Sequence, residues 1–192
     1  MLGIFLDIET TGLDPFKHSV VDIALKIIEL PTQTLLATYQ SLVKHPVDIW
    51  EKRDLISMQI NGYTWEHISQ GQEIAKVSCE IKELFNSVEI QRGKAVFICQ
   101  NPGFDRAFFS QIVDVYAQEK MNWPYHWLDL ASMYWTISHL KRVEKREPFP
   151  VSMNLSKNAI AKQYFLPPEQ EPHHALNGVD HLIQCYQAVL NL

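Results

Sequence analysis

Two acidic residues interrupt an apolar stretch near the N-terminus. Asp7 and Glu9 lie in the run from Gly3 to Glu9, whose other residues are apolar, and Thr10-Thr11-Gly12 follows. Such a run is typical of a buried strand that leads into a turn, and its side-chain period of two puts both carboxylates on one face. Two carboxylates at the end of an apolar strand repel each other unless cations bind between them. Oxygen ligands of this kind suit Mg²⁺ or Mn²⁺.

A third carboxylate and a pair of histidines stand at later element boundaries. Asp105 falls in the first turn of a helix predicted after Asn101-Pro102-Gly103, and His173 and His174 precede the last predicted helix. Taken alone, Asp105 fits an acid favoured by the helix dipole, and the histidines fit surface residues of a proline-bounded loop. Their order along the chain, with each group at the end of an element, favours a shared site instead.

A sheet and several helices must position these residues. Apolar runs predict strands over residues 3–9, 20–30, 34–43 and 95–99, and the short connections among the first three favour antiparallel pairing. Apolar residues recur every three or four positions over 65–88, 104–116, 127–137, 154–164 and 179–190, which predicts helices. The expected class is α/β, with a mixed β-sheet covered by helices on both faces. Sites in such sheets lie at the carboxyl ends of strands.

Composition limits the classes of protein that the chain can represent. The 192 residues are 46% hydrophobic and 20% charged, which predicts a folded chain with a single domain over residues 1–192. Three widely spaced cysteines argue against a disulfide framework or a zinc site. The sequence has neither a long apolar run nor a signal-peptide pattern, so we expect a cytoplasmic protein with no membrane partner.

The charge balance is acidic, with a formal net charge of −5. This argues against a general electrostatic attraction to nucleic acid, so any basic surface must be local. Lys141, Arg142, Lys145 and Arg146 follow the helix predicted over 127–137. They fit either a solvated helix end or a local patch that binds a nucleic-acid backbone.

Three segments resemble the motifs of the DnaQ-like 3′–5′ exonucleases of the DEDDh group. FLDIETTGLDP (residues 5–15) resembles the first exonuclease motif of that family, NPGFDRAFF (101–109) the second, and HHALNGVDHL (173–182) the third. Weaker likenesses over residues 60–64, 127–133 and 154–167 extend the resemblance along nearly the whole chain. The resemblance implies a ribonuclease H-like fold, in agreement with the predicted sheet.

The same resemblance implies two-metal hydrolysis at the 3′ end of single-stranded DNA or RNA. Asp7, Glu9 and Asp105 would hold two Mg²⁺ or Mn²⁺ ions, and His173 would act as the general base. Several members of the group are dimers, so a homodimer is among the states that the resemblance allows. The residues that would receive the 3′-terminal nucleotide, by motif position or as apolar stacking surfaces, are Thr10, Thr11, Gly12, Leu13, Phe16, Asn101, Phe104 and Phe108.

The third motif departs from the family pattern. Alignment on His173-x-Ala175-Leu176 puts Gly178 where the family has its last acid. Asp180 serves as the fourth metal ligand only if the alignment slips by two residues from His173, or by one if His174 is the base. Asp180 also fits a simple helix-capping position after Asn177. The alternative to an exonuclease is therefore a catalytically impaired relative that binds nucleic acid or a protein partner.

Overall fold

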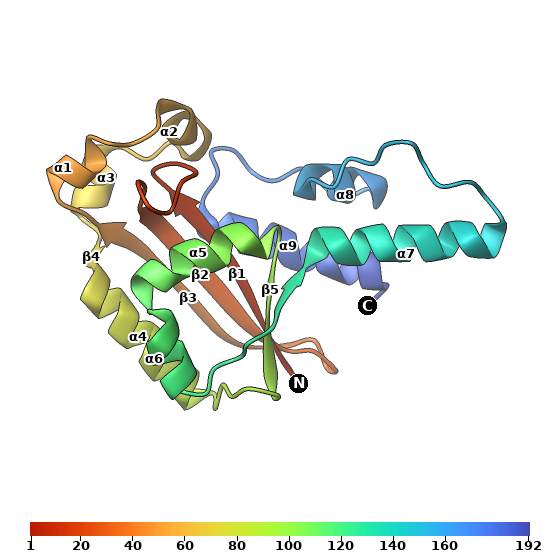
Figure 1. Ribbon diagram of the computed structural model, residues 1–192, viewed down its shortest axis with the longest axis horizontal. Coiled ribbons are helices and arrows are strands. Elements are labelled where there is room, and N and C mark those ends of the chain that lie inside the picture. The colour runs from red at the N-terminus through yellow and green to blue at the C-terminus, as the bar shows by residue number, and fades with distance from the viewer.

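The computed structural model describes all of residues 1–192, which surround one six-stranded sheet (Figure 1). Its strand order is β4-β3-β2-β1-β5-β6. β1, β2 and β3 pair in antiparallel fashion, while β5 pairs in parallel with β1 and β6, so the predicted mixed sheet is confirmed. The strands are β1 Leu2–Thr10, β2 Val20–Glu29, β3 Thr34–Lys44, β4 Gln72–Glu73, β5 Ala95–Cys99 and β6 Trp127–Asp129.

Helices cover both faces of the sheet, as the sequence predicts. Ile4, Leu6 and Ile8 of β1 pack on one face against α4 and α5, whereas Phe5 packs on the other face among residues of α7, α8 and α9. None of the helices is both long and apolar enough to cross a bilayer. The helices are α1 Val47–Trp50, α2 Leu55–Asn61, α3 Trp65–Ser69, α4 Ile74–Ser87, α5 Pro102–Ile112, α6 Val115–Lys120, α7 Leu130–Lys145, α8 Lys157–Gln163 and α9 Ala175–Leu190.

The helix predicted over residues 65–88 is divided in two by the short strand β4. Gly71 stands at the break, and a Cβ there would lie 2.8 Å from the carbonyl oxygen of Leu42 in β3. The chain approaches β3 this closely because β4 pairs with it through Gln72 and Glu73. The pairing of β4 with β3 therefore ends α3, and the apolar periodicity of residues 65–88 does not indicate this pairing.

Side-chain caps account for two further differences. The helix expected over 104–116 ends at Ile112, because the carboxylate of Asp114 accepts hydrogen bonds from the first turn of α6. The helix expected over 127–137 begins after β6, where Asp129 caps α7 in the same way, and it continues to Lys145. The strand predicted at 95–99 is confirmed with the same bounds.

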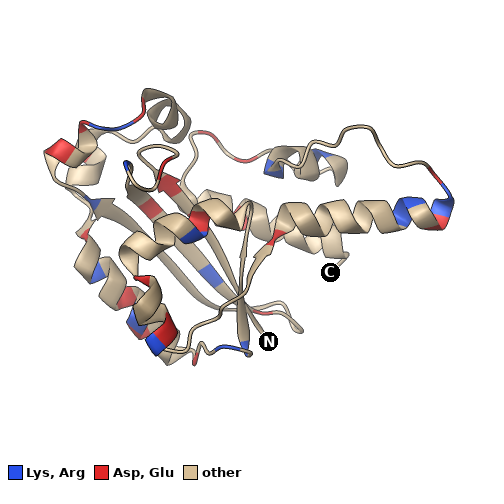
Figure 2. Ribbon diagram, in the orientation of Figure 1, with Lys and Arg blue, Asp and Glu red and all other residues tan.

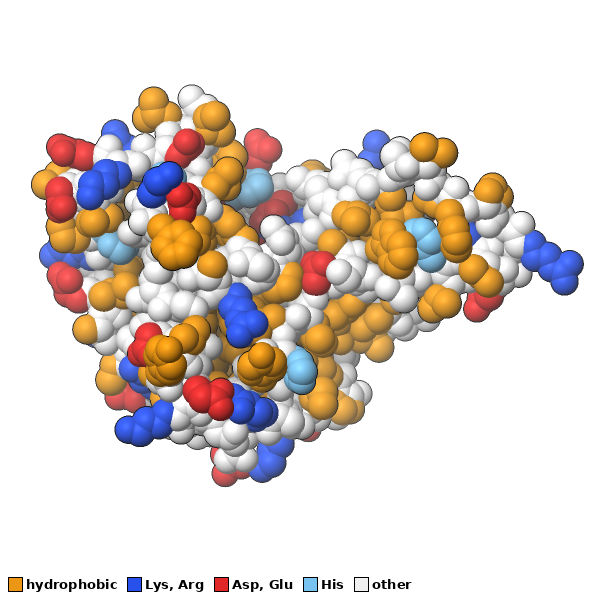
Figure 3. All heavy atoms as spheres, in the orientation of Figure 1, with side chains coloured by type: hydrophobic (Ala, Val, Ile, Leu, Met, Phe, Trp, Pro, Cys, Tyr) orange, Lys and Arg blue, Asp and Glu red, His pale blue; other side chains and the backbone are white.

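Helix α7 extends beyond the sheet as one side of an arm (Figure 1). α7 and α8 both contact α9, which returns beneath the sheet and packs on β1 and β2. Basic residues gather at the far end of α7 (Figure 2), and hydrophobic side chains lie along the arm (Figure 3). The acids of the first sequence motif lie at the opposite end of this layer, on β1.

Candidate active site

The acids of β1 lie where the strand leaves its parallel neighbour. β5 pairs with β1 only as far as Phe5, while the antiparallel pairing with β2 continues past Glu9. Asp7 and Glu9 share the face of Phe5, which is the face that α9 covers. The carboxyl end of a central strand next to such a divergence is the usual place for a site in a sheet of this kind.

Asp105 adds a third carboxyl group from α5. Asn101 precedes the helix in a left-handed conformation, with φ of 57°, and Pro102 begins it. Asp105 is buried in the first turn, and burial together with the charge of Asp7 raises its pKa well above the usual range. The turn that follows β5 thus directs an acid toward the end of β1.

Burial makes the two acids of β1 hard to ionise. Burial and the neighbouring Asp7 carboxylate raise the pKa of Glu9 to about 8. Burial also raises the pKa of Asp7, although the Lys157 ammonium opposes the change. Neither Glu9 nor Asp105 forms an ion pair with a basic side chain. When these acids ionise, the site therefore holds more negative charge than the protein itself neutralises.

A buried lysine and a fourth carboxylate complete the cluster. The ammonium of Lys157, at the start of α8, lies 3.3 Å from Asp7 Oδ1 and 2.9 Å from Glu169 Oε1. Burial alone lowers the pKa of Lys157, but the Asp7 and Glu169 carboxylates outweigh it and raise the pKa above its usual value. Lys157 does carry a sequence signal, because it shares the buried side of α8 with Ile160 and Ala161. Glu169 stands in a proline-rich loop with no such signal.

Position 178, rather than position 180, faces Asp7. A Cβ on Gly178 would lie 2.0 Å from Asp7 Oδ2 and 3.0 Å from Glu169 Oε1. Asp180 instead pairs with Lys26 of β2, and 46% of its side-chain surface is exposed. Asp180 lies two residues after Gly178 along α9, so its carboxylate points toward β2 instead of β1. The expectation that Asp180 is a metal ligand is therefore not supported.

The two histidines have different surroundings. His174 stacks on Tyr63, with ring centroids 5.0 Å apart, and precedes the first turn of α9. A positive charge on His173 lowers the pKa of Asp7, whereas one on His174 lowers the pKa of Asp22, so His173 is the histidine on the Asp7 side. His173 also lines a cavity of about 590 Å³ together with Ile56, Gln59, Ile60, Glu171 and Pro172.

Asp22 holds the elements around the histidines together. This fully buried carboxylate on β2 accepts hydrogen bonds from Tyr63 Oη at 2.6 Å and from the Ala175 N–H at 2.9 Å. It is also the neighbour of Glu9 in the β1–β2 pairing. The sequence pattern did not single out Asp22, whose signal is an acid between Val21 and Ile23, near the start of the apolar β-rich run over 20–30.

The loop after β1 is fixed at its base and exposed at its tip. Thr10 and Thr11 are buried, and the Thr11 hydroxyl accepts a hydrogen bond from the Ser19 N–H. The Gln111 amide of α5 donates to two carbonyl oxygens of the loop. Leu13 and Phe16, at the tip, are 77% and 96% exposed.

The second motif offers less surface than expected. Phe108 is fully buried in the core of the α4–α5 face, so the expectation that it stacks on a nucleotide is wrong. Phe104 is half-buried against it, with ring centroids 4.8 Å apart, and Asn101 is exposed. Phe108 is three residues after Asp105, so both lie on the inward side of α5, and Phe108 enters the core.

The acids fit a divalent cation in donor type and in charge. Carboxylate oxygens are preferred ligands of Mg²⁺ and Mn²⁺, and three poorly solvated acids with raised pKa values favour a bound cation. No group of three or more acid, histidine or cysteine side chains surrounds a common point, however. At Asp7, one oxygen pairs with Lys157 and the other faces Gly178.

Comparison with solved structures identifies the architecture. The chain superposes on the nuclease domain of 3′hExo, a DEDDh family member bound to rAMP, with a TM-score of 0.72, 13% identity, and coverage of 99% of this chain and 92% of that one. The chain has the fold of the DEDDh exonucleases. This is the ribonuclease H-like sheet that the sequence resemblance implies.

Two further similar proteins are longer than this chain, one matched by structure and one by sequence. The zinc-bound complex of E. coli exonuclease I with single-stranded DNA gives a TM-score of 0.74 at 15% identity, and 99% of this chain covers 40% of that one. The DNA polymerase III PolC-type protein of Mycoplasmopsis pulmonis is 24% identical over 108 residues, which are 56% of this chain and 7% of that protein. No family model matches the chain.

Proposed function

We propose that the protein is a divalent-metal-dependent 3′–5′ exonuclease that hydrolyses single-stranded DNA or RNA. The observation that carries this proposal is the group of acids at the carboxyl end of β1 in a DEDDh fold, with Asp7 and Glu9 partly buried on the strand and Asp105 buried at the start of α5. Their raised pKa values reflect negative charge that a bound Mg²⁺ or Mn²⁺ would offset. A structural domain has no need of such a cluster, because burying acids without partners is costly.

Different side chains would bind the metal, accept a proton and position the other groups. A divalent ion held by the acids would polarise the terminal phosphodiester and an attacking water. His173 is the group that accepts the proton of that water, since a neutral imidazole nitrogen can accept a proton and His173 lies on the Asp7 side of the histidine pair. Asp22 and Tyr63 act as positioning residues. Asp22 fixes the start of α9, and Tyr63 stacks on the ring of His174, the neighbour of His173 in the chain.

Apolar surfaces beside the acids suit the bases of a single strand. Leu13 and Phe16 project from the loop after β1, and Ile56 and Ile60 of α2 line the cavity that His173 shares. Stacking on such side chains tolerates any base, so it gives affinity for a strand end without a basic site. Thr10, Thr11 and Gly12 form the base of the loop that carries Leu13 and Phe16, and the Thr10 hydroxyl donates a hydrogen bond of 2.7 Å to the Gly12 carbonyl oxygen.

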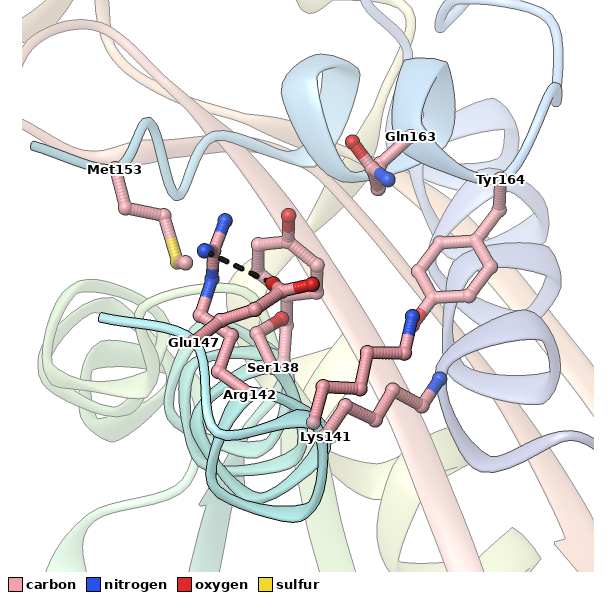
Figure 4. A pocket seen from close by; sticks show the side chains of 9 residues that line it. Ser138, Lys141, Arg142, Glu147, Met153, Gln163 and Tyr164 are labelled. Atoms are coloured by element: carbon pink, nitrogen blue, oxygen red, sulfur yellow. Dashed lines mark hydrogen bonds and ion pairs between the residues drawn. The ribbon is translucent and has the colours of Figure 1, made fainter. Parts of the chain in front are cut away.

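The basic end of α7 offers a second contact with the substrate backbone. Lys141, Arg142 and Lys145 line a pocket of about 240 Å³ that Gln163 and Tyr164 close from the side of α8 (Figure 4). The Lys141 ammonium lies over the Tyr164 ring, 5.6 Å from its centroid, while Arg142 pairs with Glu147. We propose that phosphates beyond the 3′ end bind along this segment.

A second function is favoured by one observation. Gly178 stands where the resemblance expects the last acid, and Lys157 is paired with Asp7. A protein with this arrangement could hold a 3′ end and leave it uncut. The alternative proposal is therefore a module that binds single-stranded 3′ ends.

One experiment separates the two functions. Purified protein is incubated with 3′-labelled and 5′-labelled single-stranded DNA and RNA, in Mn²⁺, Mg²⁺ or EDTA, and the products are resolved on a sequencing gel. A ladder that shortens from the 3′ end only in metal supports the exonuclease and identifies the preferred nucleic acid. Retained binding by folded protein, with no product under any condition, supports the binding module and rejects the exonuclease.

A further inference from the structure

Lys157 has the contacts of a cation that belongs to the site. Its ammonium lies within 3.3 Å of Asp7 Oδ1, 2.9 Å of Glu169 Oε1 and 3.3 Å of the Gly178 carbonyl oxygen. An ammonium group has three donors, and here each donor has one acceptor. Only 10% of the Lys157 side chain and 4% of the Glu169 side chain are exposed, so water contributes little to this arrangement.

The glycine at position 178 allows the three charged groups to meet. A Cβ there would come within 2.0 Å of Asp7 Oδ2 and 3.0 Å of Glu169 Oε1, so even alanine would displace a carboxylate. Glu169 reaches the space beside Gly178 from the loop between α8 and α9. Position 169 therefore supplies a carboxylate at the place where position 178 has no room for one.

The charges of the cluster leave a deficit of positive charge. The carboxyl groups of Asp7, Glu9, Asp105 and Glu169 share one ammonium, and that ammonium is bonded to Asp7 and Glu169. Glu9 and Asp105 have no cationic partner, and burial raises the pKa of each. One divalent cation would compensate these remaining acids. A second would add positive charge next to an ammonium that is already in place.

We propose that Lys157 is the built-in cation of this site, that it takes the place of one of the two divalent ions implied by the resemblance, and that the protein binds a single ion. Glu169 is then the acid that holds Lys157 in position, and Glu9 and Asp105 are the acids free for the divalent ion. This inference rests on the proposed function for the existence of a divalent-ion site. What is new is the number of divalent ions that the site holds, which Lys157 limits to one.

The test is a titration with Mn²⁺ in the absence of nucleic acid. Free Mn²⁺ is followed by electron paramagnetic resonance while the metal is added to the wild-type protein, Lys157→Met and Lys162→Met. We expect one ion per chain for the wild type. Lys157→Met, which keeps the length of the side chain and removes its charge, should bind a second ion or bind the first about tenfold more tightly. Lys162→Met, at an exposed position of the same helix, should match the wild type.

Several outcomes would overturn the inference. Two ions, or none, on the wild-type protein would each contradict it, and so would a Lys157→Met variant with unchanged stoichiometry and affinity. If Lys157→Met does not fold, Lys157→Arg replaces it: the arginine keeps the charge and should still admit one ion, whereas a second ion on this variant would contradict the inference. Circular dichroism on each protein shows whether it is folded.

The outcome is independent of the nuclease assay. One bound ion together with no cleavage would support the built-in cation and reject the exonuclease. Two bound ions together with metal-dependent cleavage would reject the built-in cation and support the exonuclease.

Discussion

At the level of single residues, Asp7 is the centre of the site. It touches the Lys157 ammonium, faces Gly178, and raises the pKa values of Glu9 and Asp105. We expect Asp7→Ala to abolish metal-dependent nuclease activity, measured with the labelled oligonucleotides. Asp48→Ala, at an exposed position of α1, should leave the rate unchanged. More than a few per cent of residual turnover in Asp7→Ala would argue against the assignment.

Glu9 should make stability depend on pH when no metal is present. Its pKa is about 8 in the folded protein and 4.5 as an ordinary side chain, so between these values the folded state binds more protons than the unfolded state. The free energy of unfolding should therefore be highest below about pH 4.5, as far as Glu9 is concerned, and fall as pH rises toward 8. Asp7 and Asp105 contribute in the same direction.

Thermal unfolding in EDTA across this pH range measures the effect. Glu9→Gln should flatten the decline in Tm, because glutamine does not ionise. Added Mn²⁺ should raise Tm more at pH 8 than at pH 5, since the ion binds the deprotonated acids. A Tm that rises steadily from pH 5 to pH 8 in EDTA would contradict the assigned burial of these acids.

Gly178 should tolerate no side chain. Gly178→Ala places a Cβ against Asp7 Oδ2, and overpacking of this kind costs about 1–3 kcal/mol of unfolding free energy. Gly103→Ala is the matched control, because its Cβ would meet its nearest neighbour, Asn101 Oδ1, only at 3.8 Å, and alanine favours a helix. Chemical denaturation of both variants measures the difference, and equal stabilities would refute the close approach at position 178.

At the level of elements, the end of α7 is the local basic surface of an acidic chain. Replacing Lys141, Arg142, Lys145 and Arg146 by glutamine should weaken binding of single-stranded oligonucleotides. It should also make binding less sensitive to salt, by roughly 0.7 in the slope of log K against log salt for each phosphate that the variant no longer neutralises. Fluorescence anisotropy at several salt concentrations measures both quantities. An unchanged slope would identify the segment as a solvated helix end, and Lys76→Gln on α4 is the control for removing a positive charge elsewhere.

Individual elements show how far the sequence could predict this structure. The alternation in residues 3–9 was sufficient to place Asp7 and Glu9 on one face, because one strand determines that relation. The break at Gly71 and the partner of Asp180 depend on β3 and β2, which are distant in sequence. Lys157 lies on the apolar side of α8, but its role in the site depends on contacts with Asp7 and Glu169. Only the folded chain brings these residues together.

At the level of the whole molecule, Asp22 connects the sheet to both segments that enclose the site. It joins β2 to Tyr63, which follows α2, and to the start of α9. Asp22→Ala should lower the free energy of unfolding by roughly 1–3 kcal/mol for each buried donor left without a partner. Chemical denaturation measures this loss, and a change below about 0.5 kcal/mol would show that the connection is dispensable. That residues 1–192 act as one domain stays a prediction.

The contact among Asp7, Lys157, Glu169 and Gly178 also constrains how the chain can change by mutation. Removal of Lys157 first leaves the Asp7 and Glu169 carboxylates without their ammonium partner, and removal of both acids leaves a buried ammonium. A side chain introduced first at position 178 collides with Asp7. The effect of each substitution thus depends on the residues already present at the other positions. An aspartate at position 178 would therefore require earlier substitutions at Lys157 and Glu169, and these substitutions could occur only in a restricted order.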